Sequence, residues 1–377
     1  MKKIQMVDLV TQYNNIKEEV DEAVLNVIQS AAFIKGPDVK ALESEMADYL
    51  NVNDVITCGN GTDALQIALM ALGLKPGDEV ITASFTFIAT VEVISLLGLT
   101  PVMVDVDPDT FNIDPAAIEG AITDKTKAII PVHLYGQCSN MSAIMDIAEK
   151  HGLYVIEDTC QAIGSNYTLS NGTTKKSGTI GHLGCTSFFP SKNLGCYGDG
   201  GAIFTNNEEF ANKIRIIANH GMKVKYHHEE IGVNSRLDTL QAAVLRIKLR
   251  KLDGYKEARN KAAEYYDNAF SSCEHLTVPY RDPNSTHAFH QYTLKTNGID
   301  RDELKSHLQE NGIPSMVYYP VPLHKQQAFK TANYHEPNLA VTDDLCTRVI
   351  SLPMHTEMDE EQLSLICSSV LNYVNKN

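Results

Sequence analysis

The chain has 377 residues, which is more than one hydrophobic core normally organises, since single cores stop growing near ~250–300 residues. Hydrophobic residues make up 43% and charged residues 21%, the balance of a soluble globular protein. The net charge is −15 and no basic block or stripe is visible, which argues against a nucleic-acid partner. We therefore expect one large domain, one smaller domain and no nucleic-acid-binding surface.

The eight cysteines are scattered, and none form a C-x-x-C pair of the kind that holds structural zinc. We therefore expect no metal site. The first eight residues lack the apolar segment of a signal peptide, and no apolar run approaches the ~18 residues that span a bilayer. These features predict a cytoplasmic protein with free thiols and no membrane partner.

The chain opens with two helical patterns, in which apolar residues recur at helical spacing between Ile16 and Ile28 and between Val39 and Leu50. A strand–helix rhythm follows. Strands are predicted at 55–58, 79–82, 101–106, 128–132, 154–157, 185–189 and 201–205, and helices at 62–72, 90–97, 115–122, 142–151 and 208–219. This alternation predicts an α/β fold with a mainly parallel sheet, covered on both faces, whose ligands bind at the carboxyl ends of the strands.

The pattern changes after Asn234. The stretch 236–270 is strongly helical, with a predicted interruption near Asp253-Gly254, and would connect two domains. The remainder predicts a strand near 290–296, a helix at 302–311, a strand near 314–319 and a final helix at 360–373. We predict a large domain over residues 1–250 and a small α+β domain over residues 251–377.

The most informative segment runs from Thr186 to Gly201 and reads T-S-F-F-P-S-K-N-L-G-C-Y-G-D-G-G. It places Lys192 between a predicted apolar strand and a glycine-rich loop, whose glycines let the backbone approach a bound ring closely. Apolar surroundings lower the pKa of a lysine and supply the neutral amine that Schiff-base chemistry needs. The alternative is a surface lysine in a mobile loop, the ordinary place for this residue type. The flanking pattern favours the functional interpretation.

A second segment, V-I-E-D-T-C-Q-A, places Asp158 at the end of a predicted strand. A carboxylate there can pair with the nitrogen of a pyridine ring and keep that ring able to accept electrons. Gln161, three residues further, could hydrogen-bond a ring hydroxyl. For an isolated Glu-Asp pair, the preferred alternative is a helix N-cap.

A third segment, G-N-G-T-D-A-L from Gly59, opens a helix directly after a strand. Free N–H groups at a helix start bind phosphate well, and the segment matches neither a Walker A motif nor G-x-G-x-x-G. It is either an ordinary turn or, beside Lys192 and Asp158, the site of a cofactor phosphate. The stretch 84–90 also follows a strand, and its Phe85 and Phe87 are either core residues or, for one of them, a ring-stacking aromatic.

In this order, the segments resemble the pyridoxal-phosphate (PLP) dependent sugar aminotransferases of the DegT/DnrJ/EryC1/StrS family. The similarity extends from Val7-Asp8-Leu9 to S-L-P-M-H at Ser351, and S-F-F-P-S-K-N-L-G-C-Y-G-D-G-G-A is highly specific. The resemblance implies an aspartate-aminotransferase-like fold (fold type I), PLP as cofactor and a homodimer with active sites at the subunit interface. It also implies ping-pong transfer of an amino group from L-glutamate to a keto-sugar.

The resemblance implies a role for individual residues. Lys192 matches the Schiff-base lysine and the general base and acid, Asp158 the partner of the pyridine nitrogen, and Gln161 the residue near the ring hydroxyl. The other cofactor-binding residues that it implies are Gly61, Thr62 and Asp63 at the phosphate-binding helix start, Ser187 as a hydroxyl ligand of the phosphate, Phe87 as the stacking aromatic and Asn234 as a phosphate ligand from the neighbouring subunit.

Within the family, the chain is similar to aminotransferases that act on UDP-2-acetamido-2-deoxy-3-oxo-D-glucuronate for surface polysaccharide (O-antigen) biosynthesis. Arg236 is the candidate for the uronate carboxylate, which favours a bidentate cation, and its alternative is a structural ion pair with Asp238 or at the interface. Tyr318 and His324 are further substrate candidates. The run N-S-R-L-D-T-L-Q-A-A also occurs in enzymes that aminate dTDP-3-oxo-6-deoxyhexoses, so the sugar stays open.

Three alternative functions fit the sequence less well. A PLP-dependent sugar dehydratase carries histidine in place of the lysine, and Lys192 argues against it. The second alternative is a non-catalytic PLP- or sugar-binding regulatory protein, and the sequence contains no DNA-binding motif that would support it. A dinucleotide-dependent oxidoreductase lacks its G-x-G-x-x-G fingerprint.

Overall fold

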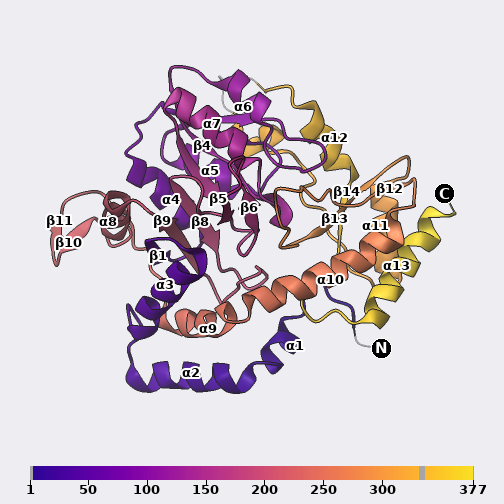
Figure 1. Cartoon of the computed structure of the whole chain (residues 1–377), viewed down its shortest axis with the longest axis horizontal. Coiled ribbons are helices and arrows are strands. Elements are labelled where there is room, and N and C mark those ends of the chain that lie inside the picture. Colours follow the sequence, from indigo (N-terminus) through magenta and orange to yellow (C-terminus); the bar gives the residue numbers. More distant parts are fainter. Residues whose placement is uncertain (1–2, 331–335, 377) are drawn as a thin grey trace.

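The computed structural model describes residues 3–330 and 336–376. A seven-stranded sheet forms the centre of the N-terminal part (Figure 1). Strand β9 pairs antiparallel with both of its neighbours, and the other neighbouring strands pair parallel. In spatial order the strands are β1 (Asp54–Cys58), β9 (Gly201–Thr205), β8 (Leu183–Ser187), β5 (Tyr154–Asp158), β4 (Thr126–Ile130), β2 (Glu79–Ala83) and β3 (Thr100–Val104). The predicted α/β class with a mainly parallel sheet is confirmed.

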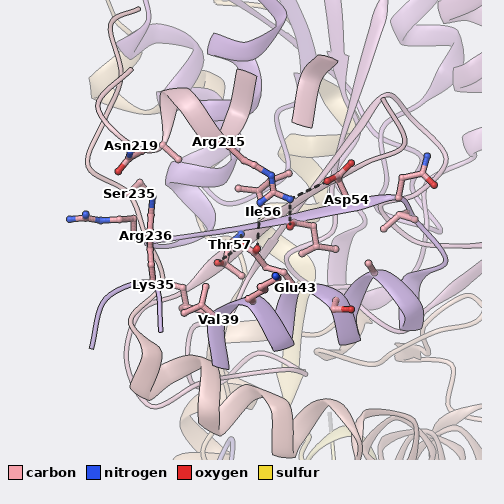
Figure 2. A pocket seen from close by; sticks show the side chains of 18 of the residues that line it. Lys35, Val39, Glu43, Asp54, Ile56, Thr57, Arg215, Asn219, Ser235 and Arg236 are labelled. Atoms are coloured by element: carbon pink, nitrogen blue, oxygen red, sulfur yellow. Dashed lines mark hydrogen bonds and ion pairs between the residues drawn. The ribbon is translucent and has the colours of Figure 1, made fainter. Parts of the chain in front are cut away.

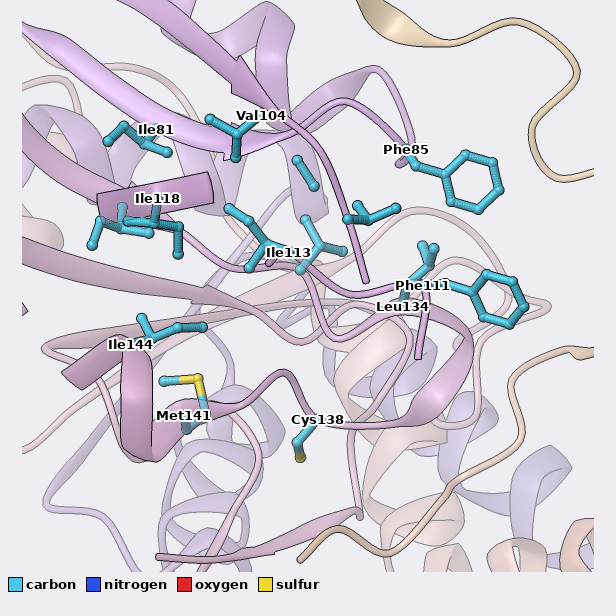
Figure 3. Packing of buried hydrophobic residues seen from close by; sticks show 14 of the residues in the cluster. Ile81, Phe85, Val104, Phe111, Ile113, Ile118, Leu134, Cys138, Met141 and Ile144 are labelled. Carbon is cyan, nitrogen blue, oxygen red and sulfur yellow. The ribbon is translucent and has the colours of Figure 1, made fainter. Parts of the chain in front are cut away.

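Helices cover both faces of this sheet because its strands are apolar on both sides. Side chains such as Val80, Ile130 and Ile156 pack against one group of helices, and their sequence neighbours Ile81, Ile129 and Val155 pack on the opposite face. The first face carries α4 (Gly61–Leu72), α5 (Ala89–Leu96) and α8 (Glu208–Ile217); the second carries α6 (Pro115–Ala121), α7 (Met141–His151), α3 (Pro37–Leu50) and α9 (Thr239–Leu249). Figure 3 shows the layer formed with α6 and α7, where Ile118 and Ile144 meet the strands.

A second, smaller sheet lies in the C-terminal part (Figure 1). Its three antiparallel strands pack with helices around a separate apolar cluster, which also takes in Ile4 from the other end of the chain. The elements are β12 (Leu276–Thr277), β13 (Tyr292–Thr296), β14 (Val349–Leu352), α10 (Leu252–Phe270), α11 (Arg301–Glu310) and α13 (Glu360–Val374). The division into residues 1–250 and 251–377 stays a prediction: Ile4 packs in this C-terminal cluster, and Leu345, Cys346 and Val349 pack against the large sheet.

Two predictions about local structure in the C-terminal half were wrong. The helical stretch breaks at Arg250-Lys251, between α9 and α10, and Gly254 lies inside α10. An exposed glycine weakens a helix by only ~1 kcal/mol, which does not end a helix that packs along its length. The strand expected near 314–319 is absent: Met316 forms one isolated bridge with Ser351, and Pro314 and Pro320 remove the N–H groups that a longer ladder would need.

Several short elements escaped prediction because they depend on tertiary contacts. They are α12 (Ala340–Arg348), the hairpin of β6 (Asn166–Thr168) and β7 (Thr174–Lys176), the hairpin of β10 (Met222–Val224) and β11 (His227–His228), and the 3₁₀ turns η1 (Leu134–Gly136), η2 (Leu323–Lys325) and η3 (Gln327–Phe329). The N-terminal helices are α1 (Leu9–Asn14) and α2 (Lys17–Ser30). In Figure 1 the β10–β11 hairpin projects from the body of the molecule, beyond α8.

Buried histidines predict that acid destabilises the protein. Burial is the main cause that lowers the pKa of His287 to about 3 and that of His355 to about 4. Below the ordinary value near ~6.5 the unfolded chain binds protons that these folded side chains refuse, so the free energy of unfolding falls as the pH falls toward 4. We expect the urea midpoint to be lower at pH 5 than at pH 7. His355→Asn should reduce this difference, and an unchanged difference would contradict the assignment.

Candidate active site

A cavity of about 660 Å³ opens at the carboxyl ends of the parallel strands. Residues that end or follow β1, β2, β4, β5 and β8 form its wall, together with residues from the C-terminal part. The cavity therefore lies where α/β sheets bind their ligands, and its volume is in the range of small-molecule sites. The predicted residues on its wall are Gly61, Thr62, Asp63, Phe87, Asp158, Gln161, Ser187, Lys192 and Tyr318.

Lys192 lies five residues beyond the end of β8, in a turn where its backbone N–H donates to Phe189 O at 2.8 Å. Its side chain faces the cavity. Burial lowers the pKa of the Lys192 ammonium, and the nearby Cys160 and Asp158 oppose this shift. A lower pKa raises the fraction of neutral amine, which is the nucleophilic form.

Asp158 is the last residue of β5 and is 5% exposed. Both of its carboxylate oxygens accept hydrogen bonds: Oδ2 from Thr90 Oγ1 at 2.9 Å and Oδ1 from the Cys160 N–H at 3.1 Å. Asp158 is not a helix N-cap, because no α-helix begins directly after this residue. The carboxylate is held in place at the cavity wall.

Glu157, the neighbour of Asp158, points to the other side of the strand and serves the fold. It is fully buried, accepts hydrogen bonds from the N–H groups of Gly178, Ile180 and Gly181, and lies 2.8 Å from His133 Nε2. Four partners occupy this carboxylate, so Asp158 is the one of the pair that is directed to the cavity.

The amide of Gln161 has a defined orientation. Its Oε1 accepts from the Tyr135 N–H at 2.9 Å, and its Nε2 donates to Tyr319 OH at 3.3 Å. One N–H of Nε2 is therefore left for a ligand in the cavity. Tyr319 comes from the C-terminal part of the chain and connects it to this residue of the large sheet.

The start of α4 approaches the strand residue Ser187 closely. A Cβ atom at Gly61 would lie 2.7 Å from Ser187 Cβ and 3.1 Å from Cys160 Sγ, so only glycine fits here. The first N–H groups of a helix have no partner within it and attract anions. The Asp63 carboxylate accepts a hydrogen bond from Ser235 Oγ at 2.6 Å, while the Asp63 N–H is capped by Asn60. The backbone N–H groups of Gly61 and Thr62 and the hydroxyl group of Ser187 are therefore the better placed groups to bind an anion.

Aromatic side chains border the cavity. Phe87 is 53% exposed, which excludes the core alternative for this residue, whereas Phe85 is buried in the core. The ring of Phe87 lies 6.2 Å from that of Tyr319, and the ring of Tyr318 lies beside that of Tyr319. An exposed aromatic at a cavity mouth can stack on a flat ligand.

Asn234 and Arg236 do not belong to the described wall of this cavity. Asn234 is exposed, and Arg236 lines a separate cavity of about 790 Å³ with Lys35 and Arg215 (Figure 2). In that cavity Arg215 contacts Asp54 and Glu43, while the guanidinium of Arg236 extends away from them. Within the described ranges no ion pair joins Arg236 to Asp238, the alternative raised by the sequence.

His324 is buried, and protein groups lie close to both of its ring nitrogens. Its Nδ1 lies 2.7 Å from Ser84 Oγ and its Nε2 lies 3.3 Å from Asp343 Oδ1. These contacts join the loop after β2 to α12. The described cavity wall does not include His324, so this placement favours support of the wall over contact with a substrate.

The residues not assigned from the sequence include Thr90, which donates a hydrogen bond to Asp158, and two residues of the cavity wall, Tyr319 beside Gln161 and His290. His290 is 7% exposed, and burial followed by the charge of Lys192 lowers its pKa well below the ordinary value. Thr90 lies in the segment 84–90 that the sequence singled out, and Tyr319 directly follows Tyr318, which the resemblance made a substrate candidate. Neither pattern indicates which side chain they contact.

Residues 3–330 and 336–376 show neither a candidate metal site nor a candidate membrane-spanning helix. No group of three or more His, Cys, Asp or Glu side chains in these ranges is arranged to hold a metal ion. No helix in the same ranges is long and apolar enough to cross a membrane.

The donor set of the cavity fits PLP. A lysine of lowered pKa and a carboxylate lie on one wall, a side-chain amide has one N–H left over, and a glycine-tight helix start adjoins two hydroxyl groups. These are groups for an aldehyde carbon, a ring nitrogen, a ring hydroxyl and a phosphate, respectively.

Comparisons with known proteins agree with this chemistry. The DegT/DnrJ/EryC1/StrS aminotransferase family matches residues 14–371. The chain is 47% identical to a pleiotropic regulatory protein of Geobacillus stearothermophilus, over 98% of each chain. It is 46% identical to the UDP-2-acetamido-2-deoxy-3-oxo-D-glucuronate aminotransferase of Pseudomonas aeruginosa, over 98% of this chain and 100% of the relative.

Solved structures extend the match to the cofactor. NtdA from Bacillus subtilis with bound cofactor PMP, the aminated form of PLP, superposes with a TM-score of 0.91 at 32% identity and covers 100% of this chain and 86% of its own. The fold is thus that of the PLP-dependent transferases of fold type I, as the resemblance implied. The chain belongs to the DegT/DnrJ/EryC1/StrS aminotransferase family and is a PLP-dependent aminotransferase.

Proposed function

We propose that this aminotransferase moves the amino group of L-glutamate to C3 of UDP-2-acetamido-2-deoxy-3-oxo-D-glucuronate, in the biosynthesis of an O-antigen or another surface polysaccharide. The observation that carries the proposal is the cavity in which Lys192, of lowered pKa, lies beside Asp158 and Gln161. The 46% identity to an enzyme named for this sugar supports the choice of substrate. We place the reaction in the cytoplasm, where nucleotide sugars and PLP are available.

The proposed roles divide among the cavity residues. When bound, PLP supplies an aldehyde carbon that bonds to amines and a ring that withdraws electrons from the attached carbon. Lys192 Nζ acts as the nucleophilic amine and afterwards moves a proton as general base and acid. Asp158 holds a proton on the ring nitrogen, and Gln161 Nε2 donates to the ring hydroxyl. Phe87 stacks on the ring.

The phosphate of the cofactor is proposed to bind at the start of α4. Gly61, Thr62 and Asp63 offer backbone N–H groups there, with a smaller share from Asp63, whose N–H is already capped. Ser187 and Thr62 add hydroxyl donors. Asn234 completes the set from the partner subunit of a homodimer, a proposal supported by its exposure and by its position outside the described wall of the cavity of its own chain.

Substrate recognition is proposed to fall to Arg236, acting across the same dimer interface, and to Tyr318. Arg236 has no competing ion pair among the described residues and lies at the edge of an open cavity. A free guanidinium fits the fork of a uronate carboxylate. His324 would act indirectly, by supporting the loop after β2.

A two-step absorbance experiment tests the function. Glutamate added to the PLP-loaded protein should bleach the visible band of the cofactor, and the keto-uronate should restore it. Bleaching without restoration by this sugar would move the proposal to another keto-sugar, with dTDP-3-oxo-6-deoxyhexoses next. A protein that shows no band, or whose band ignores every amino donor, would favour the non-catalytic regulatory alternative, for which the regulatory protein of G. stearothermophilus is a precedent in name.

The carboxylate preference rests on Arg236 and can be tested alone. Arg236→Gln should raise the KM for the keto-uronate by ~10–100-fold, the range for losing a hydrogen bond to a charged group. The same sugar with a hydroxymethyl group in place of the carboxylate should show less than a threefold change, roughly the scale of a neutral surface substitution. Steady-state kinetics on both sugars make the comparison, with Arg250→Gln as a control on an exposed arginine. Equal effects on both sugars would remove Arg236 from carboxylate recognition.

A further inference from the structure

Thr90 is the second residue of α5, and its side chain lies against Asp158. Its Oγ1 donates to Asp158 Oδ2 at 2.9 Å, and the residue is 1% exposed. The other carboxylate oxygen accepts the Cys160 N–H at 3.1 Å. One donor is therefore a backbone group that no substitution removes, and the other is a single side-chain hydroxyl.

The same short segment carries the aromatic of the cavity. Phe87 lies three residues before Thr90, and the Thr90 N–H donates to Phe87 O at 3.4 Å. The connection from β2 to α5 thus presents an exposed ring to the cavity and a buried hydroxyl to the carboxylate behind it. A hydroxyl at the beginning of a packed helix has little freedom to move away from its acceptor.

The groups near Asp158 show why this neutral donor matters. Lys192, Cys160, Cys185 and Tyr319 are titratable side chains that interact with it. Burial raises the pKa of both cysteines and of Tyr319, so these three are neutral at pH 7 and add no negative charge beside the carboxylate. A hydrogen bond to an ionised carboxylate is strong in such surroundings.

We propose that Thr90 is a positioning residue that keeps the Asp158 carboxylate directed at the ring nitrogen of PLP. This inference rests on the role proposed for Asp158. Without the hydroxyl, the carboxylate would lose one of its two hydrogen bonds, would be less well directed at the ring nitrogen and would hold the proton on that nitrogen less strongly. With PLP bound, the ring would then carry less positive charge, and the nitrogen of Lys192 attached to it would keep its proton to a higher pH.

Thr90→Val removes the hydroxyl and keeps the shape of the side chain. We expect the pH midpoint of the cofactor's visible band to rise by at least ~0.5 unit. We also expect the Kd for PLP to rise and kcat to fall by ~10-fold each, the lower end of the effect of a hydrogen bond to a charged group. Thr90→Ser, which retains the hydroxyl, should restore the wild-type midpoint. A merely structural threonine would not move this midpoint.

Thr186→Val is the matched control, because Thr186 Oγ1 is buried on β8 with no partner among the described residues. It should leave the midpoint at the wild-type value. A wild-type midpoint in Thr90→Val, or equal shifts in the Val and Ser variants, would overturn the proposal. If Thr90→Val does not fold, Thr90→Ala is compared with Thr90→Ser in its place. Failure of the proposed function is distinct from these outcomes, since it would appear in the wild-type protein itself, whose band would be missing or would not respond to glutamate and the keto-uronate.

Discussion

Lys192→Ala is expected to abolish the visible band of covalently attached PLP and to lower kcat by ~10⁴-fold or more, since it removes both the nucleophile and the general base. The side chain faces the cavity, and burial lowers the pKa of its ammonium. As the pH rises through that lowered pKa, the fraction of neutral amine grows, so attachment of PLP should begin at a lower pH than for an exposed lysine. Absorbance spectra of PLP-titrated protein measure both effects.

A second lysine provides the control. Lys295 is 9% exposed, and its Nζ contacts Pro108 O and Asp109 away from the cavity. Lys295→Met should keep the band and most of the activity. Borohydride reduction of the wild-type protein, followed by peptide mass analysis, should place the PLP label on the peptide that contains Lys192. A label on another lysine, or an intact band in Lys192→Ala, would refute the assignment.

The second large effect is expected for Asp158→Asn, which should lower kcat by ~10²–10³-fold, the range for removing one group that stabilises charge formed during a reaction. Asparagine has nearly the same shape, and its carbonyl oxygen can still accept from Thr90 or from the Cys160 N–H. It carries no charge to hold a proton on the ring nitrogen. Transient kinetics of the glutamate half-reaction should show the loss in the proton-transfer step, with PLP still bound.

Asp105→Asn is the matched control for a carboxylate elsewhere in the fold. Asp105 accepts hydrogen bonds from the N–H groups of Val341 and Thr342 and from Thr342 Oγ1, and so fixes α12 to the end of β3. Its replacement should lower the denaturation midpoint and leave the pH midpoint of the cofactor band unchanged. Asp158→Asn with wild-type kinetics, or an equal loss in both variants, would contradict the role proposed for Asp158.

The sequence by itself determined the class of the fold and the main cavity residues. Apolar strands alternate with amphipathic helices, and this periodicity dictates a sheet covered on both faces. Lys192, Asp158 and Gly61 each follow or end such a strand, and the carboxyl ends of parallel strands meet at one edge, so their convergence follows from local order alone.

The tertiary structure decided which residues support these groups. Thr90 reaches Asp158 across 68 positions of sequence and Tyr319 reaches Gln161 across 158, and no local pattern encodes such pairs. The tertiary structure also placed two of the substrate candidates away from the cavity wall. Arg236 lines a second cavity, and His324 lies between Ser84 and Asp343. The reason is physical: backbone periodicity specifies which face of an element is buried, whereas hydrogen-bond partners depend on how whole elements pack.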